Sequence, residues 1–326
     1  MHRLHRLVRL VVVPVALVAL LAAAGPAQAA PGDWWQLGYT AAGVRYNPDE
    51  TTIGPANAGR LVVGAEQVPA FGAGATFAHA SGVAVAGGRA YLQVGDFESG
   101  SSALLAYDTG AFQSPPLWQQ RSGCNNASPT VHLSIVLVGA IACRPSGDDG
   151  GVRAFDAATG RLLWYSQELG IGNGTEDASN VAVTGGVVYS IGLENGAWRL
   201  FARSVSNGAL RWKRTLPGSG GLAVAGGRVV VANGTGLRAV DAATGAPRWS
   251  VAVAATGSPA VADGLVYAGL QQGIGAWRLS DGARRWRSGT IPYGSPSVSS
   301  GRVYASGVRS ADDRLAVVVD QFRLGD

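Results

Sequence analysis

The sequence is poor in several residue types that catalytic and metal sites commonly use. It contains two cysteines, four histidines and one methionine in 326 residues, and its single lysine is Lys213. Only His79 and His132 lie beyond Ala29, and no Cys-x-x-Cys motif or cysteine–histidine cluster occurs. A structural zinc site needs four such ligands close together, so the composition argues against one.

Helical periodicity is also missing after Ala29. The apolar residues alternate with period two in short runs, and many of the 48 glycines lie between those runs. Period-two alternation with glycine-rich turns is typical of β-hairpins. We therefore expect an all-β protein.

The N-terminal stretch from Met1 to Ala29 resembles a cleaved export signal. Arg3, Arg6 and Arg9 precede an apolar stretch from Leu10 to Ala24, and the small-x-small site Ala27-Gln28-Ala29 follows. The apolar stretch is short for a membrane span, so we favour a cleaved signal peptide over an uncleaved anchor. No cysteine follows the cleavage site, which argues against a lipid anchor. We expect a secreted, extracellular protein with no membrane span after cleavage.

The charge of the chain is weak once the signal is removed. Loss of the three signal arginines lowers the formal net charge from +5 to +2. A balance this close to neutral argues against nucleic acid or an anionic membrane surface as the partner.

Cys124 and Cys143 are the two cysteines. An exported protein matures in an oxidising compartment, where two cysteines can bridge. We expect a local disulfide between them, with two separate buried thiols as the alternative.

An internal repeat dominates the rest of the chain. Residues 152–160 read Val-Arg-Ala-Phe-Asp-Ala-Ala-Thr-Gly and residues 237–245 read Leu-Arg-Ala-Val-Asp-Ala-Ala-Thr-Gly. In these copies Asp156 and Asp241 are expected to bond turn amides, and Gly160 and Gly245 to adopt positive φ. Five tryptophans recur after such turns, and we expect them to be structural residues that cover one blade and pack toward the next: Trp118, Trp164, Trp212, Trp249 and Trp286.

A repeat of roughly 40 residues with four short strands is the blade of a β-propeller. We name the strands A to D from the axis outward; the tryptophan lies on D. The last repeat has no D strand, and residues 59–63 resemble one, with Val63 in place of the tryptophan. We therefore expect six blades in a ring closed by this N-terminal strand, or seven if residues 34–58 form a further partial blade. The expected organisation is a signal peptide (1–29), an N-terminal segment (30–58) and a propeller (59–326).

The repeat Gly-Arg-Val-Tyr/Val, followed by Ala-Val-Asp-Ala-Ala-Thr-Gly-x-x-x-Trp, resembles the pyrroloquinoline-quinone-like (PQQ-like) repeat of the quinoprotein alcohol dehydrogenase-like superfamily. The segment from Asp33 to Asn57 also resembles that family's N-terminal segment. The resemblance is specific for the fold and not for an activity. The superfamily includes PQQ- and Ca²⁺-dependent alcohol and sugar dehydrogenases, and a non-enzymatic propeller lipoprotein of the outer-membrane barrel-assembly machine.

The resemblance leaves the catalytic machinery unmatched. The dehydrogenases hold PQQ and Ca²⁺ in a larger ring, and many have a disulfide between adjacent cysteines, which this chain lacks. No segment matches the family's calcium or base motifs, so no catalytic residue is carried over. PQQ and Ca²⁺ remain implied by the family resemblance alone.

Two polar D-to-A connections are candidates for a ligand or metal site. Carboxylate and amide oxygens are ligands that Ca²⁺ accepts, and connections of neighbouring blades lie side by side at the channel mouth. The alternative is a pair of solvated loops. The candidate residues are Asn125, Asn126, Glu176, Asp177, Asn180 and, in a third connection, His79.

These observations favour a secreted binding or scaffold module, without catalysis, that binds a protein or glycan partner or holds a small ligand at its polar channel mouth. The alternative is a PQQ- and Ca²⁺-dependent dehydrogenase of the alcohol or sugar type.

If the polar connections are surface loops, the double substitution Glu176→Ala with Asp177→Ala should change the free energy of unfolding by less than about 0.5 kcal/mol. Chemical denaturation of the mature protein measures this. Loss of the cooperative transition would show instead that the two carboxylates are structural.

Overall fold

The computed structural model describes most of the repeat region and part of the N-terminal segment. The described residues are 33–34, 36, 38–45, 47, 57, 60–62, 64, 78–96, 101–123, 127–140, 151–166, 181–311 and 314–323. Within them the chain forms 24 β-strands, with a short 3₁₀ turn, η2 (Thr109–Ala111), between two of the strands. The all-β prediction is confirmed.

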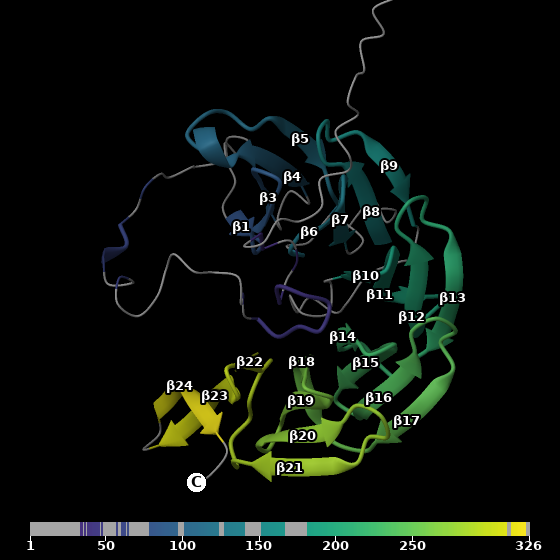
Figure 1. Ribbon diagram of the computed structural model, residues 1–326, viewed down its shortest axis with the longest axis vertical. Coiled ribbons are helices and arrows are strands. Elements are labelled where there is room, and N and C mark those ends of the chain that lie inside the picture. The colour runs from purple at the N-terminus through teal and green to yellow at the C-terminus, as the bar shows by residue number, and fades with distance from the viewer. Residues whose placement is uncertain are drawn as a thin grey trace, which may run out of the picture.

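The strands form six antiparallel sheets around a common axis, as the blades of a propeller (Figure 1). Blade 1 contains β1 (Ala78–Ala80), β2 (Ala84–Ala86), β3 (Arg89–Asp96), β4 (Ser101–Asp108) and β5 (Trp118–Arg121). Blade 2 contains β6 (Thr130–His132), β7 (Ile135–Ala140), β8 (Gly151–Asp156) and β9 (Leu162–Tyr165). Blade 3 contains β10 (Ala182–Thr184), β11 (Val187–Glu194), β12 (Ala197–Ser204) and β13 (Leu210–Thr215). Blade 4 contains β14 (Gly221–Ala225), β15 (Arg228–Asn233), β16 (Gly236–Asp241) and β17 (Pro247–Val251). Blade 5 contains β18 (Ala255–Ala262), β19 (Leu265–Leu270), β20 (Ile274–Arg278) and β21 (Arg284–Ser288). Blade 6 contains β22 (Ser297–Ser299), β23 (Arg302–Ala311) and β24 (Arg314–Arg323). The predicted six blades are confirmed.

The turn between strands A and B explains why the sequence repeats a glycine pair. In blade 4, Gly226 and Gly227 have φ of 54° and 69° and join β14 to β15. Both central residues of such a hairpin turn need positive φ, which matches the twist of the two strands and which glycine adopts without strain.

The hydrophobic core lies between neighbouring blades. Tyr91 of blade 1 and Phe155 of blade 2 belong to one buried cluster, and Leu200 of blade 3 and Val229 of blade 4 belong to another. The inner strands contact one another in the order β2, β6, β10, β14, β18 and β22. The sheets of blades 2 to 5 thus bury residues on both faces against their neighbours, and the buried positions of their inner strands are mostly apolar.

Each D-strand tryptophan of blades 1 to 4 packs onto the C–D turn glycine of the next blade. A Cβ at Gly245 would lie only 2.6 Å from Cε3 of Trp212, so the indole rests directly on the glycine backbone. The indole N–H of each tryptophan donates to a backbone carbonyl oxygen of the same turn region at 2.7–3.1 Å. The tryptophan and glycine pairs are Trp118 with Gly160, Trp164 with Gly208, Trp212 with Gly245, and Trp249 with Gly282.

The aspartate of the repeat holds the same turn from inside. Oδ1 of Asp241 accepts hydrogen bonds from the amides of Ala243 and Thr244 and from the Thr244 hydroxyl, at 3.0–3.1 Å. The hydrogen bond from Arg248, reinforced by those from Thr244, lowers the pKa of Asp241 to about 2. Asp156 makes the matching bonds in blade 2, and its Thr159 bonds lower its pKa as well. The turn therefore presents its glycine to the neighbouring indole in a fixed conformation.

The seam between blades 6 and 1 corrects one expectation. Arg60, Leu61 and Val62, the described part of the expected closing strand, form no strand pair, and the last sheet has three strands in the described part of the chain. Leu61 and Val62 are 62% and 86% exposed. Gly64 lies farther along, where it lines a hollow of about 390 Å³ with residues 109–114 of blade 1.

Strand β24 also ends three residues later than the sequence predicts. Asp320 lies opposite Ala305, inside the strand, and its carboxylate accepts a hydrogen bond from the buried Tyr293 hydroxyl. The strand continues to Arg323, which lies opposite Arg302, so no aspartate-held turn follows Asp320. Trp286 of blade 5 consequently packs edge-on against Phe322 of β24, with ring centroids 5.2 Å apart.

The tryptophan–glycine contact predicts unequal effects for two alanine substitutions in blade 4. Gly245 and Gly227 both have φ of 69°, but only Gly245 faces an indole, and a Cβ at Gly227 meets nothing within 4 Å. Gly227→Ala should cost about 1–2 kcal/mol from backbone strain. Gly245→Ala should cost about 1–3 kcal/mol more, because Trp212 must move.

Urea denaturation of both variants measures the difference directly. Equal losses of stability would contradict the interlock between blades.

Candidate functional site

The N-terminal segment occupies the centre of the ring. We call its described residues between 33 and 45 the hub segment; it is the purple trace on the axis in Figure 1. The hub segment accepts a hydrogen bond from a valine amide of the inner strand in five of the six blades, at 2.6–3.2 Å. The acceptors and donors are Trp34 O with Val85, Gln36 Oε1 with Val183, Ala41 O with Val224, Ala42 O with Val261, and Val44 O with Val298.

These five valines occupy one equivalent place in their blades. Each is the last residue but one of its inner strand, next to the A–B turn; Val224, for example, lies opposite Val229, and Val261 lies opposite Val266. The hub segment therefore satisfies the channel-facing backbone donors of sheets that lie far apart in the sequence.

Small residues let the hub segment fit on the axis. Ala41 and Ala42 pack against the inner-strand clusters of blades 3, 4 and 5. A Cβ at Gly43, whose φ is 67°, would lie 2.9 Å from the carbonyl oxygen of Pro259. Gln36 is 1% exposed, and its Nε2 atom has no hydrogen-bond partner.

This part of the channel does not fit PQQ with Ca²⁺. Hub backbone and the side chains of Ala41 and Ala42 pack against the inner strands here, and the charged hub side chains bond to backbone: Asp33 accepts from the Gly87 amide, and Arg45 donates to the carbonyl oxygens of Gly43 and Pro296. A calcium site needs six to eight oxygen ligands around one point. Among the described residues, no three side chains of histidine, cysteine, aspartate or glutamate gather.

Most of the site residues expected from the sequence lie outside the described residues. His79 is the exception; its backbone lies in β1, opposite Gly95 of β3. The expected disulfide also falls outside. The undescribed residues are Asn125, Asn126, Glu176, Asp177, Asn180, Cys124 and Cys143.

The described flanks of the two polar connections meet, however. Thr130, the first residue of β6 after the first connection, donates its hydroxyl to the carbonyl oxygen of Val181 at 3.2 Å. Val181 directly follows Asn180, the end of the second connection. The two connections thus leave the ring from adjacent points on blades 2 and 3.

A buried polar cluster lies beside the first connection, between blades 1 and 2. Nε2 of Gln93 donates to the Ser122 hydroxyl at 2.9 Å, and Arg153 donates to the Ser122 carbonyl oxygen at 3.0 Å. Gln93 is fully buried with its Oε1 atom unpartnered, Arg153 is 8% exposed, and the Arg153 guanidinium lies 4.5 Å from the ring centre of Tyr165. Sequence reasoning missed this cluster because its members come from separate strands and belong to no motif.

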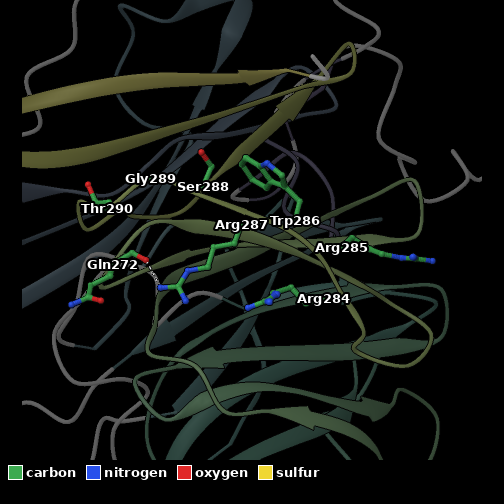
Figure 2. A pocket seen from close by; sticks show the side chains of 8 residues that line it. All are labelled: Gln272, Arg284, Arg285, Trp286, Arg287, Ser288, Gly289 and Thr290. Atoms are coloured by element: carbon green, nitrogen blue, oxygen red, sulfur yellow. Dashed lines mark hydrogen bonds between the residues drawn. The ribbon is translucent and has the colours of Figure 1, made fainter. Parts of the chain in front are cut away.

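A second polar feature lies on the outer edge of blade 5. Arg284, Arg285 and Arg287 flank Trp286 on β21, and the B–C turn residue Gln272 closes one end of a hollow of about 890 Å³. Arg287 donates to the carbonyl oxygen of Gln272 at 2.7 Å. In Figure 2, Arg284 and Arg287 extend to the same side of the strand, Trp286 extends to the other side, and Arg285 extends away along the strand.

The comparison with known families follows the fold. A family model described as outer membrane protein assembly factor BamB matches residues 49–288 and, in an overlapping match, residues 203–320. The chain belongs to this family. Membership agrees with the PQQ-like repeat predicted from the Asp-Ala-Ala-Thr-Gly turns. No protein of curated function matches the chain.

Solved structures similar to this family member include a BamB protein and two dehydrogenases. BamB from Moraxella catarrhalis is 18% identical, with a TM-score of 0.53, and the match covers 74% of this chain and 71% of that one. Quinohemoprotein alcohol dehydrogenase ADHIIG from Pseudomonas putida HK5 is 17% identical, with a TM-score of 0.61 and coverage of 85% and 57%, so this chain spans little more than half of that enzyme. A europium-containing methanol dehydrogenase is 12% identical, with a TM-score of 0.56 and coverage of 91% and 86%. At these identities the likeness shows the fold alone.

No helix in the part of the chain that the structure describes is long and apolar enough to cross a membrane.

The hub segment predicts that Gln36 stabilises the ring. Gln36→Ala removes the acceptor of the buried Val183 amide and should lower the free energy of unfolding by about 1–3 kcal/mol. The exposed Gln272 serves as the control, because Gln272→Ala should change stability by less than about 0.5 kcal/mol.

Chemical denaturation of the two variants tests this. If Gln36→Ala is as stable as Gln272→Ala, the side chain does not hold the hub segment to blade 3.

Proposed function

We propose that this member of the BamB family is an exported, non-catalytic β-propeller that binds a protein partner through the face carrying its D–A and B–C connections. The observation that carries the proposal is the hub segment, which ties five blades together beside their A–B turns. Residues of the hub segment use the axis for backbone hydrogen bonds to five blades, so the ring is built as a rigid support with its variable groups on the loops.

The binding surface that we propose surrounds the mouth between blades 1, 2 and 3. The polar connections carrying Asn125, Asn126, Glu176, Asp177 and Asn180 leave the ring at points joined by the Thr130 to Val181 hydrogen bond. The buried Gln93, Ser122 and Arg153 cluster supports the base of the first connection. Polar loops on a rigid base are common in protein recognition, where the scaffold limits the entropy lost on binding.

Export is part of the same proposal. Residues 1–29 would be removed after Ala29, residues 30–58 would supply the hub segment, and residues 59–326 would form the ring. A Cys124–Cys143 disulfide would then close the first polar connection against the B–C turn of blade 2. The family description, an outer membrane protein assembly factor, supports a location outside the cytoplasm.

Site-specific photo-crosslinking in the cell that makes the protein tests the proposal. A photo-reactive residue at Asn126 or Glu176 should capture a protein, and the same residue at Asp263, an exposed position in the A–B turn of blade 5, should not. Equal capture at all three positions, or none at any of them, would contradict the proposed binding face.

The same purified protein separates this function from dehydrogenation. With PQQ, Ca²⁺, a primary alcohol or an aldose, and an artificial dye acceptor, it should reduce no dye, and PQQ should not raise its melting temperature. Dye reduction that depends on PQQ would overturn the non-catalytic assignment.

A further inference from the structure

One basic residue beside the D-strand tryptophan pairs with a carboxylate in blade 3 and one in blade 4. In blade 4, Arg248 precedes the D-strand tryptophan and pairs with Asp241 at 2.6 Å. In blade 3, Lys213 follows the tryptophan and pairs with Glu194 at 2.8 Å, a bond that lowers the Glu194 pKa. Arg285 and Arg287 occupy these two places in blade 5.

Both neutralising carboxylates are replaced in blade 5. Arg278 stands where blade 4 has Asp241, because their amides donate to equivalent turn carbonyl oxygens, those of Ala283 and Ala246 respectively. Arg278 takes up Asp281 in a 2.7 Å ion pair, so that carboxylate does not reach β21. At the B–C turn, where blade 3 has Glu194, blade 5 has Gln272, and Arg287 bonds to its backbone carbonyl oxygen instead.

The geometry gathers this charge in one place. A register shift between Ala276 and Trp277 makes Arg285 the extra residue of β21. Arg284 and Arg287 consequently extend to the same side, into the hollow closed by Gln272 (Figure 2). Both are exposed, and neither forms an ion pair with a carboxylate in the described residues.

β21 is also an edge strand. It is the last strand of the sheet β18–β19–β20–β21, and no described strand pairs with its outer side. An edge strand presents unpaired amides and carbonyl oxygens to which an extended segment can add. Guanidinium groups bind carboxylates through paired hydrogen bonds, so an acidic extended segment would satisfy both the side chains and the edge. The weak overall charge argues against a long polyanion.

We propose that an acidic, extended segment of a protein partner binds along β21, with its carboxylates on Arg284 and Arg287. The hollow opens where the B–C turn meets the D–A connection at Gly289 and Thr290, so it lies on the face assigned to partner binding. The inference thus rests on the proposed function in one respect, that the partner is a protein.

Fluorescence anisotropy of the mature protein with a labelled peptide of alternating glutamate and threonine tests the site. Arg284→Glu with Arg287→Glu should weaken binding by about tenfold or more, because two charge-assisted contacts become repulsive. Arg211→Glu, at an exposed place beside the β13 tryptophan, should leave the affinity within about twofold, as weak exposed charges do. If the double glutamate variant does not fold, Arg284→Gln with Arg287→Gln replaces it with the same expected direction.

Four further probes test which chemistry the site recognises. The same peptide with glutamine in place of glutamate should not bind, and the glutamate peptide with methylated backbone amides should bind more weakly, since it cannot add to the edge. Inorganic phosphate and vesicles of anionic lipid should compete poorly. Equal binding of the glutamine peptide or of the methylated peptide, or equal competition by phosphate or vesicles, would overturn the proposal.

The two hypotheses fail separately. Unchanged peptide binding by the double variant, together with capture at Asn126 or Glu176, would remove only the β21 site. Loss of capture at those positions, with peptide binding that depends on Arg284 and Arg287, would reject the mouth as the partner surface. The β21 site would then still stand.

Discussion

The channel-facing amides of the inner strands must be hydrogen-bonded, and much of the ring depends on how this chain satisfies them. An inner strand pairs with its own blade on one side only, so its other edge points at the axis. Val85, Val183, Val224, Val261 and Val298 donate from that edge to one short segment. Because this segment touches five blades at once, it joins sheets that share no ladder connection. The N-terminal segment thus ties the ring together from the centre, whereas the repeat pattern predicts a closing strand at the outer edge.

The periphery depends on a different contact, which is directional. Each tryptophan reaches forward to the next blade's glycine, so four copies connect five blades and the chain of contacts has two free ends. At one end Trp286 meets Phe322 in place of a glycine; at the other, a Cβ at Gly110 would meet only Asp108 among the described atoms. The seam is therefore the place where the outer interlock is missing, and the hub segment matters most there. Val44 and Arg45 reach blade 6 while Trp34 reaches blade 1, so the two blades at the seam are held by the two ends of one segment.

The repeat could be predicted from the sequence because its physics is local. Asp241 bonds the amides of Ala243 and Thr244 within its own turn, and Gly245 has the positive φ that the turn needs, so spacing alone identifies both. The hub could not be predicted in this way. Its bonds run from an irregular segment to strands as far along the chain as Val298, and any residue type can supply a backbone carbonyl acceptor. The register of β24 was also hidden: Asp320 looks like a turn aspartate, but a tyrosine hydroxyl from the preceding connection holds it inside the strand. Of the expected channel-mouth residues, His79 alone lies in the described chain, so that site stays a prediction.

In such a ring, functional positions are easiest to recognise where one blade differs from the others. Positions that hold the scaffold are under the same constraint in blades 1 to 5, so the tryptophan recurs there whatever the protein binds. The charged positions beside the tryptophan are free of that constraint, since they face solvent. In blade 3 Glu194 pairs with Lys213, and in blade 4 Asp241 pairs with Arg248. Blade 5 keeps the cations and exchanges both carboxylates, for Gln272 and Arg278. An arginine-rich edge also discourages pairing between copies of the chain, but one uncancelled charge would serve that purpose. Arg284 and Arg287 extend to the same side of a hollow, and the carboxylate that would pair with Arg287 is replaced by Gln272, which fits the recognition of a carboxylate-bearing segment better than simple repulsion.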